Sequence, residues 1–573
     1  MKNSHITDKS RRSFLRKSSL WSIGAMTLPP LLGSFLSSCE DDFLDRAPLD
    51  AITDVTFWKT EEQLKMAVNG CYASLKGKNV VDMENLGDNT IYPPRSDYQA
   101  ISSGNFDFST GTINSEWVAQ YNGIRRCNHF LENYAKAEGI QEDDMARYAG
   151  EVRFIRAFLY SYLTFFFGDV QLITKPLEVN DPEVYGTRQD RAKVVDFILA
   201  ELEDAAKGLP PTYGAADLGR ITKGAALGWK SRVALFYGRW DVAEAAAKAV
   251  MDLGVYQLYS NGDPKTSYNE LFTDKGKLST GGNKETMIAR LHVLDVATHN
   301  MSRETQVPDQ QARFSPTKSL VDSYLCTDGK PITLSDLYSE DTYADIFKNR
   351  DPRLSQTVLA PGSEWGGKDD GDTDANPSAI FTTPKYNADK KGCLTGTGYY
   401  FTKYVDIAAV GTYNKDDNDI HVMRYAEVLL TYAEARMEQG TLTQLDVDNT
   451  INKLRERVGM APMVLADLAA WGLDLRQEIR RERRVELALE GQRYFDILRW
   501  KQGDLLAQDV KGVKKSLIPT HNQKYITSIP VDADGYTIIQ SGRRFENPKN
   551  YLWPIPFTQL QRNPQLGQNP GWE

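Results

Sequence analysis

Cysteine and histidine are scarce in this chain. Its 573 residues include five cysteines and six histidines. Four of the cysteines lie after residue 39, far apart and without a CxxC pair: Cys71, Cys127, Cys326 and Cys393. This spacing predicts neither a zinc site nor a dense disulfide framework. HExxH and GxSxG motifs and a phosphate-binding glycine loop are also missing, so nothing in the sequence indicates a metal or another cofactor.

A positive net charge is absent as well. The formal charge of the whole chain is −9. Residues 1–38 carry six basic and one acidic side chain, a net of +5, so removing them would leave −14. Nucleic acid is bound by a basic footprint that neutralises its phosphates, and an acidic mature chain therefore argues against a nucleic-acid partner.

Long apolar runs are confined to the N-terminus. Six basic residues precede an uncharged stretch over residues 18–38, which is the layout of a secretory signal peptide. Pro29, Pro30 and Gly33 interrupt this stretch, and it is short for a spanning helix, so a permanent transmembrane segment is the weaker interpretation. Residues 10–16 resemble a twin-arginine export signal, although an ordinary basic segment explains them equally well.

The end of this segment predicts a lipid anchor. Residues 36–39 are an apolar residue, two serines and Cys39, a pattern that resembles the lipobox of bacterial lipoproteins. An unmodified cysteine is the alternative, but its position directly after the apolar stretch favours lipidation. Glu40, Asp41 and Asp42 resemble the acidic tract that sends lipoproteins of the Bacteroidetes type to the cell surface; a solvated charged tether is the other interpretation.

Helical periodicity dominates the first half of the mature chain. A capping box at residues 60–63 begins an amphipathic helix that extends to Leu75. The same period predicts helices over residues 117–134, 145–166 and 194–206. Residues 222–256 and 425–458 each resemble a tetratricopeptide hairpin, in which small residues let two short helices approach closely.

The second half of the mature chain has a different amino-acid composition. Between about residues 264 and 422, Gly, Pro, Asp, Asn and Thr predict long loops and short strands, with an exposed loop over 366–391. Residues 475–500 predict one long charged helix with i, i+4 ion pairs, and the tail 547–573 is not expected to be helical. We therefore divide the mature chain into regions 39–263 and 264–573.

Motifs along the whole mature chain resemble those of one family, the SusD-like (RagB/SusD) nutrient-capture lipoproteins. The first half carries Asp42, Phe43, Leu44, Asp45, Phe57, Trp58, Asn69, Gly70, Tyr72, Glu151, Arg153, Phe154, Arg156, Gly168, Asp169, Gly219, Arg220 and Lys223. The second half carries Ser315, Pro316, Asp322, Tyr324, Glu478, Arg481, Glu482, Arg483, Glu486, Glu490, Gly491, Arg493, Trp500, Trp553, Pro554, Pro556, Asn563, Pro564, Asn569 and Gly571. The last two motifs, at 478–500 and 553–571, are specific.

The resemblance implies a fold and a role. The fold would be mainly α, with four tetratricopeptide-like helix pairs that support a loop-rich ligand face. The protein would be anchored on the outer face of the outer membrane beside a SusC-like TonB-dependent transporter. It would capture oligosaccharide or another nutrient without acting as an enzyme, and deliver it to the transporter barrel.

Candidate ligand residues lie in the predicted loops. Asp88, Tyr92, Arg95 and Tyr98 follow the first helix, and the Gly-rich loop is flanked by three aromatic residues, Trp365, Tyr399 and Tyr400. Sugars bind to aromatic faces and to planar polar groups, which these residues offer. Core packing is the competing interpretation for each aromatic ring, including Trp553 near the end of the chain.

Two other function classes remain open. In an extracellular glycoside hydrolase, Glu482, Glu486 and Glu490 would supply paired carboxylates. The interleaved arginines would keep these carboxylates ionised, whereas a general acid needs a raised pKa, and we therefore interpret them as structural ion pairs. The second class is a surface scaffold that binds other proteins through its helical hairpins.

Overall fold

The computed structural model describes residues 57–91, 96–306, 312–366, 380–386, 394–412 and 414–573. The signal segment and Cys39 lie outside these ranges, as do the candidate ligand residues Tyr92 and Arg95. Helices make up most of the regular structure of the described residues, and three two-stranded antiparallel sheets complete it. The predicted mainly α class is confirmed.

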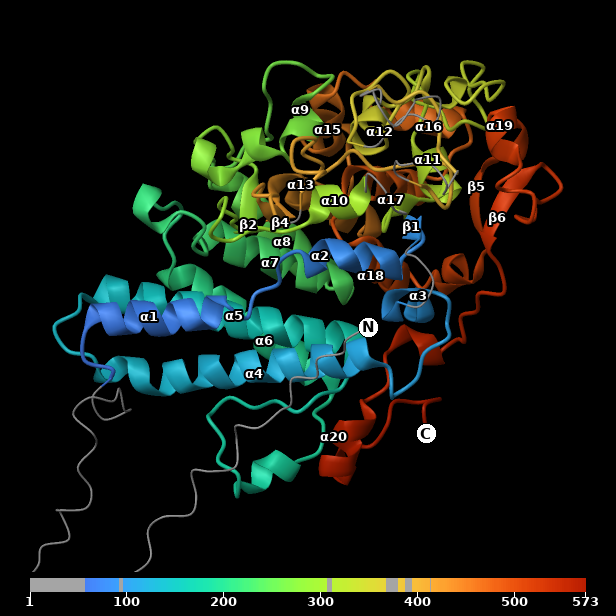
Figure 1. Cartoon of the computed structure of the whole chain (residues 1–573). Helices are drawn as coiled ribbons and strands as arrows, with labels where there is room; N and C mark the ends of the chain where they lie inside the picture. The colour runs from blue at the N-terminus through green and yellow to red at the C-terminus, as the bar shows by residue number, and fades with distance from the viewer. Residues whose placement is uncertain (1–56, 92–95, 307–311, 367–379, 387–393, 413) are drawn as a thin grey trace, which may run out of the picture. The chain divides into compact units, whose positions relative to one another are not determined.

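Long helices in the first half of the chain pack one against the next (Figure 1). They are α4 (Gly111–Asn133), α5 (Glu142–Phe167), α6 (Arg191–Gly208), α7 (Lys223–Phe236) and α8 (Trp240–Asp252). The first helix, α1 (Glu61–Tyr72), packs against α4 and α5. The predicted capping box is present, because the Thr60 hydroxyl accepts a hydrogen bond from the amide of Gln63 and the Gln63 side chain accepts one from the amide of Thr60.

The two predicted tetratricopeptide-like units are both helical pairs. The first is the α7–α8 hairpin. The second begins with α13 (Tyr425–Glu438), which packs against α7, α8 and α17 (Leu475–Glu486) although it comes late in the chain. Its partner is interrupted at Thr450, which gives α14 (Gln444–Asn449) and α15 (Ile451–Arg457). The stack of helices thus continues from the first region into the second.

Short elements separated by loops occupy residues 264–422, as the sequence predicts. The helices are α9 (Ser267–Glu270), α10 (Met301–Thr305), α11 (Lys318–Ser323) and α12 (Pro352–Thr357). Strand β1 (Thr90–Ile91) pairs with β3 (Ser315–Pro316), and β2 (Thr286–Arg290) pairs with β4 (Ile420–Arg424). Strand β5 (Val510–Lys514) pairs with β6 (Tyr536–Gln540) later in the chain.

Aromatic side chains from both regions form the main core. On α5, Phe166 stacks on Trp553 with ring centroids 4.0 Å apart, and Phe158 lies 4.4 Å from Trp229 of α7. Trp553 is 1% exposed, and its indole N–H donates to the Tyr494 hydroxyl at 3.0 Å. Burying large rings in this way removes much apolar surface from water. Trp553 is therefore a packing residue rather than a ligand platform.

The predicted continuous helix over 475–500 is wrong. The segment forms α17 and a separate helix, α18 (Arg493–Arg499). Between them Leu489 has φ of 63° and Gly491 has φ of 70°, and neither value continues a right-handed helix. The amide of Gly491 donates to a carboxylate oxygen of Glu84 at 2.8 Å, and a Cβ on Gly491 would lie 2.0 Å from the backbone oxygen of Val80. Tertiary contacts thus terminate the helix.

The remaining elements are short. They are α2 (Asn79–Asp82), α3 (Asp97–Ser102), α16 (Leu465–Ala470), α19 (Thr520–Gln523) and α20 (Phe557–Arg562). Helix α20 corrects the prediction that the tail is not helical: it begins directly after Pro556 and ends before Asn563, which explains its short length. In the part of the chain that the structure describes, no helix combines the length and the apolar character needed to cross a membrane.

Candidate ligand-binding site

Arg424, at the end of β4, is the centre of a buried ion-pair network. Its Nε and Nη2 each lie 2.8 Å from a carboxylate oxygen of Glu490. Its Nη1 lies 2.7 Å from a carboxylate oxygen of Glu285 and 2.7 Å from one of Glu486. All four side chains are almost completely buried. Because a buried charge is costly without a partner, these contacts fix β4 against the segments that supply the carboxylates.

The same network decides the role of the three glutamates. Arg353 Nη1 lies 2.7 Å from Glu482 and 2.9 Å from Glu486. Burial would raise the pKa of Glu486, but the surrounding guanidinium groups outweigh it and hold the pKa well below its usual range. Burial likewise opposes ionisation of Glu490, yet Arg424 and Lys403 lower its pKa to about 2. Glu486 and Glu490 are therefore permanently ionised partners in ion pairs, and they lack the raised pKa of a general acid.

Three of the predicted ligand residues lie in the core. Trp365, Tyr399 and Tyr400 are at most 2% exposed. Trp365 and Tyr400 pack around Phe381 with centroid distances of 5.1 and 5.6 Å, and Tyr399 stacks on Tyr343 at 6.3 Å. Since both faces of a buried ring are occupied by protein, these residues offer no free stacking surface. The competing interpretation, core packing, is the correct one for them.

The other predicted residues lie around strand β1. Tyr98, in α3, is half-buried and packs against the main core. Tyr92 and Arg95 fall outside the described residues, so their roles stay predictions. Ile91, the last residue of β1, pairs with Ser315 of β3, so the chain segments that contain these two residues lie side by side. Long loops on a rigid scaffold are common binding positions.

Asp88 lies just before β1 and binds two arginines. Its Oδ1 is 2.6 Å from Arg493 Nε, and its Oδ2 is 3.0 Å from Arg493 Nη2 and 3.2 Å from Arg484 Nη2. Burial would raise the pKa of Asp88, but the two guanidinium groups outweigh it and hold the pKa well below its usual range. The Asp88 carboxylate thus acts as a fixed anion that positions two arginines, whereas the sequence suggested a direct ligand contact.

A cavity of about 590 Å³ opens beside Asp88. This size is within the range of roughly 300–1,000 Å³ that is typical of small-molecule sites. The walls come from α11, α17, β5, β6 and the segments around them. Polar and charged side chains dominate the lining: Asp88, Lys318, Asp322, Arg481, Arg484, Gln508, Asp509, Lys511, Asp534, Tyr536 and Arg543. Such a lining suits a ligand rich in hydroxyl groups.

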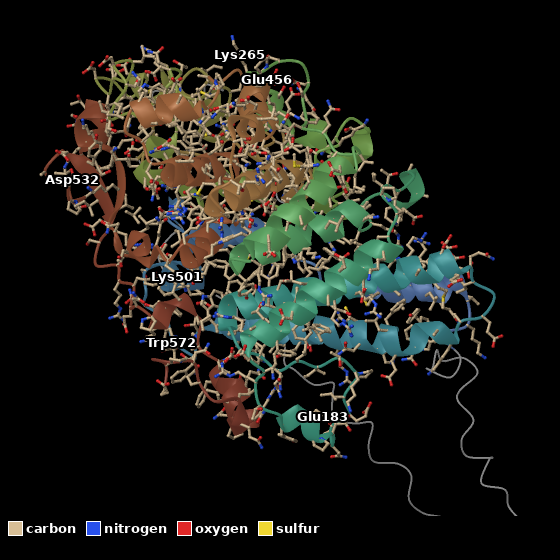
Figure 2. All side chains as sticks on the ribbon, turned by 180° about the vertical axis from the view of Figure 1, so that it is seen from behind. Glu183, Lys265, Glu456, Lys501, Asp532 and Trp572 are labelled. Carbon is tan, nitrogen blue, oxygen red and sulfur yellow. The ribbon has the colours of Figure 1, made fainter. Side chains whose placement is uncertain are left out.

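One aromatic ring faces this polar lining. Tyr536, the first residue of β6, is half-buried, and its hydroxyl donates to a carboxylate oxygen of Glu340 at 2.5 Å. The ammonium group of Lys318 lies 4.1 Å from the ring centroid. Lys511 forms an ion pair with Asp532 at 2.7 Å, and Figure 2 shows Asp532 at the outer edge of the β5–β6 pair. The ammonium group of Lys514 also lies over the ring, 5.0 Å from its centroid. The cavity therefore combines a tyrosine ring that contacts two ammonium groups with fixed hydrogen-bonding groups.

A second cavity, of about 420 Å³, lies between α4 and residues 171–184. Its polar groups are already bound to backbone: the Tyr121 hydroxyl donates to Gln171 O at 3.0 Å, and Arg125 donates to Leu177 O at 2.8 Å. Groups engaged in this way have less capacity for a ligand. The cavity beside Asp88 is the better candidate.

Sequence reasoning missed most of the residues in the walls of that cavity. Arg484 belongs to a motif that the sequence analysis assigned to ion pairs alone. Tyr536 and Arg543 follow no motif, and only the antiparallel pairing of β5 with β6 brings them to the cavity. No strands were predicted over residues 510–540, so no sequence signal pointed to these two residues.

Family models match both halves of the chain. Residues 292–572 match a model described as the SusD family, and residues 42–235 match one described as starch-binding associating with outer membrane. The chain belongs to the SusD-like family.

SusD-like relatives align with nearly the whole chain. A SusD-like protein of Formosa agariphila is 23% identical over 93% of this chain and 96% of its own length. Starch-binding protein SusD of Bacteroides thetaiotaomicron is 23% identical over 95% and 97%. The crystal structure of a SusD-like carbohydrate binding protein from Bacteroides fragilis superimposes with a TM-score of 0.76 at 28% identity, covering 89% of this chain and all of that one.

Proposed function

We propose that this protein is a non-enzymatic, surface-anchored lipoprotein that captures a glycan and delivers it to a SusC-like TonB-dependent transporter. The observation that carries the proposal is the polar cavity beside Asp88 within a SusD-like fold. Similar proteins are named for starch binding and carbohydrate binding, which supports a glycan as the nutrient.

Recognition would rest on the residues that line the cavity. A half-buried tyrosine, Tyr536, would stack on the C–H side of a sugar ring, which would displace an ammonium group that lies over its ring. Gln508 and the charged groups around it provide donors and acceptors for hydroxyl groups. The segment that contains Tyr92 and Arg95, together with Tyr98, remains a predicted part of the same ligand face.

Calorimetric titration with a panel of oligosaccharides tests this proposal. Tyr536→Ala should weaken binding of the recognised glycan about two- to twelvefold, since stacking on one aromatic ring contributes about 0.5–1.5 kcal/mol. Tyr185→Ala is the matched control, because Tyr185 is half exposed and lies outside the cavity. Equal losses in both variants, or none in Tyr536→Ala, would reject this site.

The absence of turnover separates the proposal from the hydrolase alternative. A binding protein releases its glycan unchanged, whereas a hydrolase generates new reducing ends. A reducing-sugar assay after prolonged incubation with the bound glycan measures this directly. Release of reducing sugar by the purified protein, abolished in Glu486→Gln, would establish an enzyme instead.

The anchor and the partner need separate tests. Cys39→Ser should abolish incorporation of labelled fatty acid and release the protein from the membrane fraction, because the acyl chains would be lost. A tagged full-length chain solubilised from outer membrane should co-purify with a large TonB-dependent barrel. Recovery with other surface proteins alone would favour the alternative of a protein-binding scaffold.

A further inference from the structure

Arg484 and Arg543 line the cavity beside Asp88, and the part of the lining that they form with Asp88 is its inner wall. Arg493 binds both oxygens of Asp88, and Arg484 contacts one of them. Within the described ranges Arg543 pairs with no carboxylate: it donates to the backbone oxygens of Leu506 and Ser102 and to the Gln540 side chain. The inner wall therefore carries an excess of positive charge.

Arg484 has capacity for a further acceptor. Its Nε donates to the Asn89 side chain at 2.8 Å, and its Nη2 donates to the Ser319 hydroxyl at 3.0 Å. Its Nη1 donates to no residue within the described ranges. Arg484 lines the cavity and only 11% of its side chain is exposed, so a ligand that reaches it would meet a largely buried cation.

The lowered pKa values of Arg484 and Arg543 also favour an additional anion in the cavity. Burial lowers the pKa of Arg484 to about 10, and repulsion from Arg493 adds to this effect, while Asp88 opposes it only in part. Burial lowers the pKa of Arg543 to about 10 as well. Both guanidinium groups remain charged at neutral pH, but an additional anion nearby would stabilise them.

Besides Asp88, which is bound by two arginines, the carboxylates that line the cavity are either exposed or paired. Asp509 and Asp534 also line it, and both are exposed. Lys318 is paired with Asp322, so these two charges largely cancel. Exposed charges act through water and mobile ions, whereas buried guanidinium groups act at short range in a lower dielectric. The field at the inner wall is therefore set by the arginines.

We propose that the cavity selects an acidic saccharide and holds its anionic group, a carboxylate or a sulfate ester, against the guanidinium of Arg484. The inference rests on the proposed function, because it names the class of glycan for the same site. Arginine suits both groups, since its planar N–H donors match their oxygens. The neutral part of the sugar would lie toward Tyr536.

Matched pairs of ligands test this selection by isothermal titration calorimetry on the full chain without its signal segment. One pair is an oligogalacturonate and its methyl ester, which share hydroxyl groups and differ in charge. The other is a sulfated galactan oligosaccharide and its desulfated form. The acidic member of at least one pair should bind about tenfold more tightly or better, as expected for a charge-assisted hydrogen bond. The two pairs distinguish carboxylate from sulfate as the source of the anion.

Variants assign the effect to the inner wall. Arg484→Gln should remove most of the preference for the acidic member, while Arg484→Lys should retain part of it. Asp534→Asn removes an exposed negative charge and should raise affinity for the acidic member without weakening the neutral one. Equal affinities within both pairs, or a preference that Arg484→Gln leaves intact in a folded protein, would overturn the inference. If only neutral glycans bind, the inference fails and the proposed function stands; if no glycan binds, the proposed function fails.

Discussion

Replacing Arg424 by glutamine should destabilise the protein strongly, because it breaks the centre of the buried ion-pair network. Three carboxylates contact the Arg424 guanidinium, and each retains at least one cationic partner after the change: Glu285 keeps Arg457, Glu486 keeps Arg457 and Arg353, and Glu490 keeps Lys403. Breaking a buried pair typically costs about 3–5 kcal/mol. Since the remaining cations compensate in part, we expect the lower end, about 3 kcal/mol.

Urea unfolding followed by far-ultraviolet circular dichroism and tryptophan fluorescence measures this free energy. Arg476→Gln is the matched control, because Arg476 forms an ion pair with Glu438 but its side chain is 49% exposed. Exposed pairs contribute about 0–1 kcal/mol, so the control should remain close to wild type. A loss below about 1 kcal/mol in Arg424→Gln, or an equal loss in both variants, would refute the reasoning.

The same variant should change the response to acid. The pKa of Glu490 is lowered from 4.5 to about 2 in the folded protein. A carboxylate with a lowered pKa contributes stability above its unfolded pKa, and this contribution is lost as the pH falls from about 4.5 toward 2. Without Arg424 the pKa rises toward its ordinary value. The stability difference between wild type and Arg424→Gln should therefore be largest above about pH 4.5 and shrink as the pH falls toward 2.

Three further predictions concern single positions, each measured by urea unfolding. Gly491→Ala should cost about 2–4 kcal/mol, because it places a Cβ at positive φ against the backbone of Val80. Trp553→Ala should cost about 3–5 kcal/mol through lost packing, and Trp553→Phe clearly less. Burial raises the pKa of Asp416 to about 7, so the wild type loses stability as the pH rises from about 4 through 7. The free energy of unfolding of Asp416→Asn should equal that of the wild type near pH 4 and exceed it by about 1 kcal/mol near pH 8.

Local sequence signals predicted the helical half of the fold well. The capping box at Thr60 and the apolar periodicity of α1, α4, α5 and α6 are properties of neighbouring residues, and the structure contains these helices within a few residues of their predicted bounds. The expected helix over 475–500 failed for a non-local reason. Gly491 binds Glu84 and packs on Val80, about four hundred positions earlier in the chain, and no periodicity in 475–500 encodes that contact.

The candidate site was harder to predict for the same reason. An aromatic residue beside a Gly-rich segment is equally consistent with a core and with a platform, and Trp365 belongs to the core. Asp88 was identified as polar and near the ligand face, but its role depends on Arg484 and Arg493. Tyr536 reaches the cavity only through strand pairing. The types of residue at the site could thus be predicted from the sequence, whereas the orientation of their side chains could not.

The central claim is that this SusD-like protein binds a glycan without consuming it. The most direct measurement is calorimetric titration of the purified protein with an oligosaccharide panel, followed by mass spectrometry of the recovered ligand. We expect saturable binding of at least one glycan, and we expect to recover that glycan intact. Recovery of cleaved glycan, or failure of every neutral and acidic glycan to bind, would contradict it.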